Sequence, residues 1–200
     1  MTIDIRTLQE TNEDHYFRLA EILKASWGHL DGLTFLDFES RAERGSKTFV
    51  AHDSQPVGII QTIGIRQLEL LRTLDYSLLA MLREPQDPRY RLCLDVTIAK
   101  EALKQGLGRN LINYAIFQTA CFEPSIERIL TYTPKGMESW HIKKNGAVLT
   151  DIPTIARARP GHNPEDVVIL DYTARLTEYR RDLSNLAPLI SAGKIPISLK

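Results

Sequence analysis

One short segment in the middle of the chain constrains the fold more than any other. Residues 91–98 are the strongest candidate in the chain for a central strand. The loop that follows contains Gly106 and Gly108, and an amphipathic helical pattern begins at Leu107. A strand that leads through a glycine loop into a helix predicts a mixed α/β domain.

The two glycines also make this loop a candidate phosphate-binding site. Glycine lets the backbone approach a ligand closely, and the positive end of the following helix attracts an anion such as pyrophosphate. A glycine pair before a helix is also an ordinary tight turn, so the loop alone leaves both interpretations open. A dinucleotide-binding loop fits poorly, because the loop lies mid-chain and Asn110 and Leu111 stand where a third glycine is needed.

Strands and helices are predicted on both sides of this unit. The strands fall at the N-terminus and over residues 47–52, 56–65, 126–133, 147–153 and 167–172, and the helices over residues 13–27, 35–44, 66–83, 136–144 and 176–190. Turn-forming residues 53–55 join two of the strands as a hairpin. We predict a single domain over residues 1–200, with a core over 3–173 and a C-terminal helix and tail over 174–200.

Composition supports one compact domain and argues against several functions. The 25 basic residues balance 25 acidic ones, so no global field favours nucleic acid or an anionic membrane. Cys93 and Cys121 each lie in an apolar segment, which predicts two buried, reduced thiols. Residues 1–10 contain no apolar run of signal-peptide type, and no stretch approaches the roughly 20 apolar residues that span a bilayer. We therefore expect a cytoplasmic protein.

With this order of elements, two motifs resemble the GNAT superfamily of N-acetyltransferases. Residues 105–111 (Gln-Gly-Leu-Gly-Arg-Asn-Leu) resemble the family's acyl-CoA loop. Residues 140–147 (Trp-His-Ile-Lys-Lys-Asn-Gly-Ala) resemble its short helix ending in a Gly-Phe or Gly-Ala pair. The resemblance covers residues 3–172 and implies a GNAT fold, in which helices flank a central, mostly antiparallel mixed sheet. It also implies an acyltransferase that passes an acetyl group to an amine.

The resemblance implies acetyl-CoA or another acyl-CoA as co-substrate, and no metal. The backbone groups of Val96 and Ile98 would pair with the pantetheine arm. The predicted pyrophosphate site consists of Lys104, Gln105, Gly106, Leu107, Gly108, Arg109 and Asn110. The family usually has Arg or Gln at the position of Leu103, so a positive side chain would have to come from Lys100, Lys104 or Arg109.

The family's usual catalytic acid is missing from this chain. Many members carry a tyrosine four residues before the late glycine, where this chain has Ile142. His141 is the neighbouring candidate, because imidazole titrates near pH 6.5, although a partly exposed helix residue without a role explains it equally well. Thr97 takes the position beside the thioester in the resemblance, where its hydroxyl can bond the carbonyl. Thr97 is also an ordinary β-branched strand residue.

Three further residues are candidates for substrate binding. Arg157 and Arg159 lie in a basic loop and suit a carboxylate or phosphate on the substrate, although a solvated loop has the same composition. Trp27 ends the first long helix, where the family builds its acceptor site, and as part of an apolar stripe it also suits the core. The loop, His141 and Trp27 also resemble the GNAT-like loading domains of polyketide synthases, which handle acyl groups on carrier proteins.

Three functions follow from these patterns. The first is direct acyl transfer from acyl-CoA to a small-molecule acceptor in a ternary complex. The second is an S-acyltransferase or decarboxylase that acts on malonyl or acyl thioesters with an acyl carrier protein as partner. The third is a non-catalytic acyl-CoA-binding module. The acceptor stays open, because the first helices and the inserted segment over residues 66–90 carry no recognisable code, and a homodimer stays open too.

Overall fold

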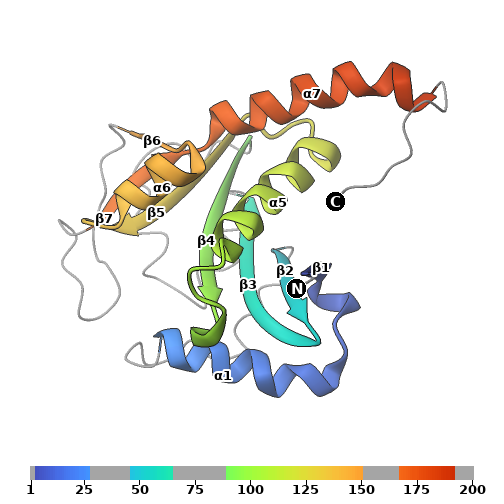
Figure 1. Cartoon of the computed structure of the whole chain (residues 1–200). Coiled ribbons are helices and arrows are strands. Elements are labelled where there is room, and N and C mark those ends of the chain that lie inside the picture. The colour runs from blue at the N-terminus through green and yellow to red at the C-terminus, as the bar shows by residue number, and fades with distance from the viewer. Residues whose placement is uncertain (1–2, 28–45, 65–88, 151–166, 192–200) are drawn as a thin grey trace.

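A computed structural model of the chain describes residues 3–27, 46–64, 89–150 and 167–191. The helices predicted over residues 35–44 and 66–83 lie outside these residues, as does the basic loop with Arg157 and Arg159. What is described is a mixed sheet with helices packed on both faces (Figure 1).

In the described residues, seven strands form one sheet in the order β1-β2-β3-β4-β5-β7-β6. Along the chain they are β1 (Asp4–Thr7), β2 (Lys47–Asp53), β3 (Gln55–Gly64), β4 (Tyr90–Ile98), β5 (Arg128–Pro134), β6 (Val148–Leu149) and β7 (Val167–Asp171). Every neighbouring pair is antiparallel except β4 and β5, which run parallel. The predicted mostly antiparallel mixed sheet is therefore confirmed.

Helices cover both faces of this sheet. The described helices are α1 (Tyr16–Trp27), α5 (Leu107–Phe122), α6 (Glu138–Asn145) and α7 (Thr173–Ser191), with short 3-10 turns η1 (Leu8–Glu10), η2 (Glu13–His15) and η3 (Lys100–Ala102). On one face, Leu19 and Leu23 of α1 pack against Ile59 of β3. The neighbouring Ile60 points to the other face and packs with Leu111 of α5.

The parallel strands β4 and β5 pair over only part of their length. Pairing runs from Tyr90 and Arg128 to Cys93 and Thr131 and then stops. Strand β4 nevertheless continues to Ile98, and β5 continues beyond Thr131 as well. The two strands therefore leave a gap between their C-terminal halves, which we call the β4–β5 gap.

A β-bulge in β4 lies where the gap begins. On the β3 side, Gln61 pairs with Asp95 and Thr62 pairs with Cys93, so Leu94 has no partner of its own. A bulge bends its strand and increases the local twist. The bulge and the end of the β4–β5 pairing fall at the same level, which explains why the strands diverge there.

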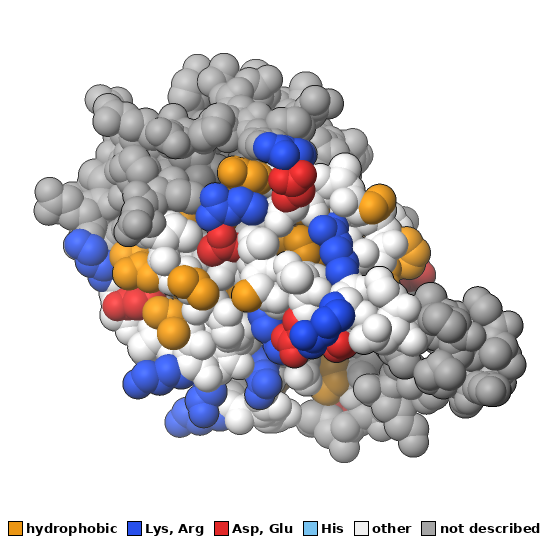
Figure 2. Space-filling view, turned by 90° about the horizontal axis from the view of Figure 1, so that it is seen from above, with side chains coloured by type: hydrophobic (Ala, Val, Ile, Leu, Met, Phe, Trp, Pro, Cys, Tyr) orange, Lys and Arg blue, Asp and Glu red, His pale blue; other side chains and the backbone are white. Residues whose placement is uncertain are grey.

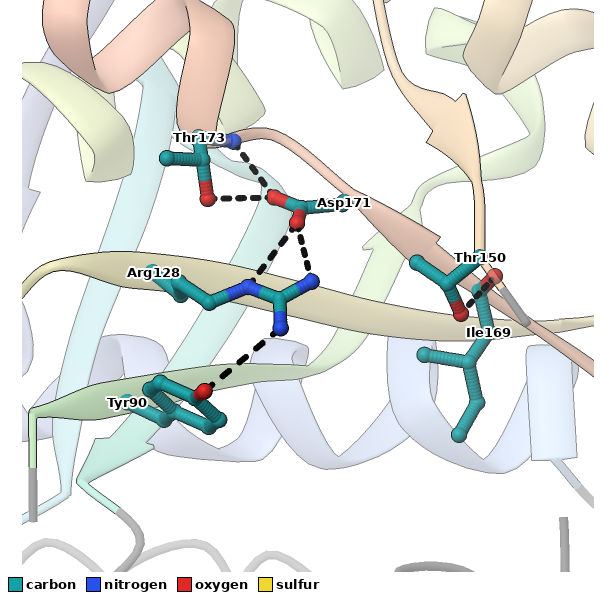
Figure 3. Close-up of polar contacts among 6 residues, drawn as sticks. All are labelled: Tyr90, Arg128, Thr150, Ile169, Asp171 and Thr173. Carbon is teal, nitrogen blue, oxygen red and sulfur yellow. Dashed lines mark hydrogen bonds and ion pairs between the residues drawn. The ribbon is translucent and has the colours of Figure 1, made fainter. Parts of the chain in front are cut away.

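A polar network holds the closed end of the β4–β5 pair (Figure 3). Arg128 of β5 donates from Nε and Nη2 to one carboxylate oxygen of Asp171 on β7, at 3.0 and 2.5 Å. Its guanidinium also lies 5.1 Å from the ring centre of Tyr90. The second oxygen of Asp171 accepts the backbone N–H of Thr173 at 2.7 Å, at the start of α7. One carboxylate thus links two strands and the first turn of a helix.

Charge on the described surface is mixed in sign. On the face seen in Figure 2, basic and acidic side chains lie next to each other. Along α7, Arg175 pairs with Glu178 at 2.5 Å, and Arg181 pairs with Asp182 at 3.5 Å. This mixing follows the equal numbers of acidic and basic residues, and it leaves the field on this face without a single sign.

Candidate active site

The β4–β5 gap exposes backbone groups of β4 that no described strand pairs. The N–H of Ala99 donates to the carbonyl of Val57 on β3 at 2.8 Å. Successive residues of a strand present their backbone groups to opposite edges, so Thr97 also faces β3, whereas Val96 and Ile98 face the gap. The structure therefore directs the backbone of the two predicted pantetheine-binding residues into the opening.

Helix α5 begins next to this gap. Its N-cap residue, Gly106, has a left-handed backbone with φ 77°, and its carbonyl accepts the N–H of Asn110 at 3.1 Å. No side chain caps this helix, and its first turn contains no acidic residue. The first-turn N–H groups and the helix dipole can therefore receive an anion.

The residues predicted to hold pyrophosphate surround this N-terminus. Most of them are exposed, namely Lys104, Gln105, Gly106, Arg109 and Asn110. Leu107 is buried in the core, so only its backbone can serve a ligand. The side chain of Gln105 donates to the carbonyl of Glu101 at 3.3 Å, which fixes the loop before the helix.

Gly108 is the point where α6 packs on α5. A side-chain carbon at Gly108 would lie 3.4 Å from two ring atoms of Trp140 and 3.8 Å from a side-chain carbon of Ile98. The indole of Trp140 therefore covers the first turn of α5 next to the end of β4. The sequence left Gly108 open as a position of close ligand approach or part of a tight turn, and the structure adds a packing role.

His141 lies half-buried on α6, between Trp140 and Tyr172. Its Nδ1 is 2.5 Å from the hydroxyl oxygen of Tyr172, which is fully buried. The Trp140 ring meets the imidazole edge-on, with ring centres 4.8 Å apart. Sequence analysis missed Tyr172, because it follows β7 and lies 31 residues from His141. Both interpretations of His141, a catalytic residue and a partly exposed helix residue without a role, stay predictions.

Burial changes the charge of His141. Desolvation penalises the imidazolium and lowers the pKa of His141 to about 4. The ring is therefore neutral near pH 7, with one nitrogen that donates a hydrogen bond and one that accepts. The pKa of His141 therefore lies well below the value near 6.5 that the sequence alone suggested.

The two catalytic candidates lie on opposite faces of the sheet. Thr97 pairs with Ile59, whose side chain packs under α1, so the buried side chain of Thr97 also faces α1. His141 lies on the α5 side, because its partner Tyr172 belongs to the core cluster beneath α5. The two residues therefore approach the sheet from opposite directions.

Solved structures share this arrangement of strands and helices. An aminoglycoside acetyltransferase in complex with coenzyme A has a TM-score of 0.60 at 18% identity, covering 90% of this chain and 99% of that one. A GNAT-family acetyltransferase from Staphylococcus aureus has a TM-score of 0.54 at 15% identity, covering 85% and 98%. The chain has the GNAT fold.

A third solved structure gives the same result, whereas comparisons of the sequence find no match. A spermidine N-acetyltransferase chimera that includes the Vibrio cholerae enzyme also shares the GNAT fold, with a TM-score of 0.55 at 14% identity, covering 89% of this chain and 99% of that one. No protein-family model and no curated protein sequence matches the chain. The resemblance to polyketide synthase loading domains stays a prediction.

Several residues singled out from the sequence have no described side chain. Trp27 is the last residue of α1, but its side chain is not among those described, and the same holds for Cys93. Arg157 and Arg159 lie in an undescribed segment. The roles proposed for these residues stay predictions. The thiol of Cys121 is free and half-buried rather than buried, and desolvation raises its pKa.

No three histidine, cysteine or acidic side chains within the described segments are grouped so as to hold a metal ion. Among the helices that the structure describes, none combines the length and the apolar character required to cross a membrane.

The His141 pKa predicts how the stability of this GNAT fold depends on pH. The folded pKa of about 4 lies below the unfolded value of about 6.5, so the unfolded chain takes up the proton first. Stability from this residue is therefore complete above pH 6.5 and is lost as the pH falls toward 4. Between pH 7.5 and 5, we expect the parent to lose about 2 kcal/mol more unfolding free energy than His141→Gln.

Urea unfolding of both proteins at the two pH values measures this difference. Burial, Arg6 and His15 lower the pKa of His52 in both proteins, so the contribution of His52 to the pH dependence cancels in this comparison. Equal losses in the parent and the variant would contradict a depressed pKa at His141.

Proposed function

We propose that the chain is an acyltransferase that binds acyl-CoA in the β4–β5 gap and transfers the acyl group directly to an amine. The observation that carries this proposal is the gap itself. It combines backbone groups of Val96 and Ile98 with an adjacent helix N-terminus that no side chain caps. An extended amide-rich arm and a pyrophosphate are the two chemistries that such a site suits.

Structures with the same fold support this choice of ligand. The aminoglycoside acetyltransferase was solved with coenzyme A, and a phosphinothricin acetyltransferase from Sinorhizobium meliloti was solved with acetyl-CoA. In the present chain the pantetheine amides would pair with the gap edge of β4. The pyrophosphate would lie at Gly106 and the first turn of α5, with the exposed Lys104 and Arg109 to supply positive charge.

In the proposed reaction, residues from both faces of the sheet act on one thioester. A neutral amine attacks the thioester carbonyl, and the resulting tetrahedral oxyanion is stabilised by hydrogen-bond donors at the gap. The C–S bond then breaks, the nitrogen releases its extra proton to solvent, and the coenzyme A thiolate is protonated from solvent. In this proposal Thr97 would act on the reacting carbon from the α1 face and His141 from the α5 face. No covalent enzyme intermediate is needed.

A thermal-shift panel of coenzyme A and acetyl-, malonyl- and longer acyl-CoA tests this proposal. A ligand at about a hundred times its dissociation constant adds roughly 2.7 kcal/mol of apparent stability. We expect acetyl-CoA to stabilise the chain by that order, and the best stabiliser identifies the acyl group. No stabilisation by any member at millimolar concentration would contradict the site.

Turnover is then measured as thiol release from acetyl-CoA with a panel of amines. The panel contains spermidine, an aminoglycoside and an alanine-terminated peptide, which are the acceptors in the names of structurally similar enzymes. A carrier-protein acceptor is tested with a phosphopantetheine thiol, and malonyl-CoA decarboxylation by release of carbon dioxide. Thiol release that depends on an amine supports acyl transfer from acyl-CoA to an amine.

One observation favours a second function, that of a non-catalytic acyl-CoA-binding module. Ile142 stands where many GNAT members have their acid, and its side chain is 38% exposed and cannot donate a proton. A module of this kind would bind acyl-CoA in the thermal-shift panel and would release thiol slowly, at a rate that no acceptor changes. The two assays therefore separate the two functions.

A further inference from the structure

The residue after β7, Tyr172, is held more firmly than its place at a strand end requires. Its backbone N–H donates to the carbonyl of Ile129 at 2.8 Å, and its own carbonyl accepts the N–H groups of Arg175 and Leu176 at 2.9 and 3.1 Å. The preceding residue, Asp171, is fixed by Arg128. The phenol therefore projects from a backbone that is tied to both β5 and α7.

The side chain of Tyr172 is as constrained as its backbone. It is fully buried in the core cluster that includes Leu107, Ile129 and Leu176. Its hydroxyl reaches across to α6 and lies 2.5 Å from Nδ1 of His141. A rigid phenol at this distance fixes the rotation of the imidazole ring.

The chemistry of the two groups favours one direction for this hydrogen bond. A phenol keeps its proton near pH 7 and is a good donor, and a neutral imidazole has one nitrogen free to accept. If the phenol donates to Nδ1, the ring proton lies on Nε2. The two ring nitrogens point in nearly opposite directions, so Nε2–H is directed away from the phenol.

We propose that Tyr172 is a positioning residue that holds His141 as its Nε2–H tautomer, so that the ring serves the reacting thioester as a neutral hydrogen-bond donor. This inference rests on the proposed acyl transfer. In this role His141 does not deliver a proton. Its Nε2–H instead stabilises the oxyanion that forms on the thioester carbonyl. A donor that is fixed before the reaction needs no reorganisation when charge develops.

Burial of the imidazole supports this role independently of the tautomer. With a pKa of about 4, only about one molecule in a thousand carries the imidazolium at pH 7. A group that is almost never charged is a poor source of protons at that pH. The neutral ring is present in nearly every molecule at pH 7, so the proposed role uses the neutral N–H as the donor.

The first test determines the tautomer of the His141 imidazole in the absence of any substrate. Long-range proton–nitrogen spectra of the full chain, labelled with ¹⁵N-histidine, distinguish Nδ1–H from Nε2–H, and the His141→Gln variant assigns the signals. We expect the Nε2–H pattern in the parent and a mixture of tautomers in Tyr172→Phe. An Nδ1–H pattern in the parent would overturn the inference.

The second test separates positioning from a merely structural role. Tyr172→Phe is expected to lower kcat for thiol release about 10- to 100-fold, with the KM for acetyl-CoA within about twofold. In a His141→Gln background, Tyr172→Phe should cause no further decrease in kcat. An equal loss in both backgrounds would mean that Tyr172 acts through the fold, and would overturn its role through His141.

Tyr179→Phe is the matched control, because Tyr179 is a half-buried tyrosine of α7 whose ring meets Phe117 with centres 5.8 Å apart. It should leave the tautomer and kcat unchanged. Thermal unfolding of both tyrosine variants checks that each is folded. Absence of acyl-CoA binding in the parent would overturn the proposed function and this role with it. An Nδ1–H tautomer with intact binding would overturn this inference alone.

Discussion

Gly106→Val is expected to weaken coenzyme A binding at least about 100-fold while the chain stays folded. At φ 77° a β-branched residue is strained by about 1–2 kcal/mol, so the loop should relax away from its present path. No described atom lies within 4 Å of the added carbon, so the variant does not clash with the protein. The valine instead occupies the space in which the pyrophosphate would approach the helix N-terminus.

Isothermal titration of coenzyme A measures this effect, and Gly136→Val provides its control. Gly136 also has a left-handed backbone, with φ 92°, and also faces open space, but it lies between β5 and α6. Both variants should lose similar unfolding free energy, whereas only Gly106→Val should lose affinity. Equal affinity in the two variants would remove the phosphate site from this loop.

His141→Ala is expected to lower amine-dependent thiol release by about 100- to 1,000-fold. Removal of one preorganised donor to an oxyanion typically has this cost. The dissociation constant for acetyl-CoA should change little, because the donor serves the transition state more than the ground state. Any limb that His141 contributes to the pH profile of the parent should lie near its pKa of about 4 rather than near 6.5.

Ser139→Ala, an exposed change on the same helix, should leave both turnover and the pH profile unchanged. The comparison shows whether a loss in His141→Ala comes from the imidazole or from a disturbed α6. If His141→Ala keeps the parental rate, catalysis at this gap relies on Thr97 and bound water. A limb near 6.5 that disappears in His141→Ala would instead mean that the ring is charged and acts as an acid.

Most elements of the described fold could be predicted from local sequence pattern. The hairpin is one example, because a single residue, Ser54, with φ 59°, joins β2 and β3 inside the predicted turn. The end of α6 is another, since Gly146 has the left-handed backbone expected after a helix. These features depend on residues close together in the chain, and local conformational preference determines them.

Features that depend on distant residues could not be predicted in this way. Strand β7 lies between β5 and β6, so the two closing strands are paired as expected but their order in the sheet was not foreseen. The bulge at Leu94 is invisible in an apolar run, because it arises from the pairing with β3. The same applies to the contact of Trp140 with Gly108 and to the contact of the Tyr172 hydroxyl with His141.

The placement of Thr97 and His141 on opposite faces has a consequence for how such a chain can diversify. Leu19 and Leu23 of α1 pack on the face that Thr97 shares, and α5 packs on the other face, while Ile22 of α1 joins the cluster under α5. In the proposed enzyme, exposed positions of α1 that contact neither Glu101 nor the core under α5 are the ones where a substitution would leave the donor surface undisturbed. If the acceptor binds on the α1 side, as the family resemblance implies, selection for a new acceptor should change these positions of α1 and leave Ile22 and Arg18 untouched.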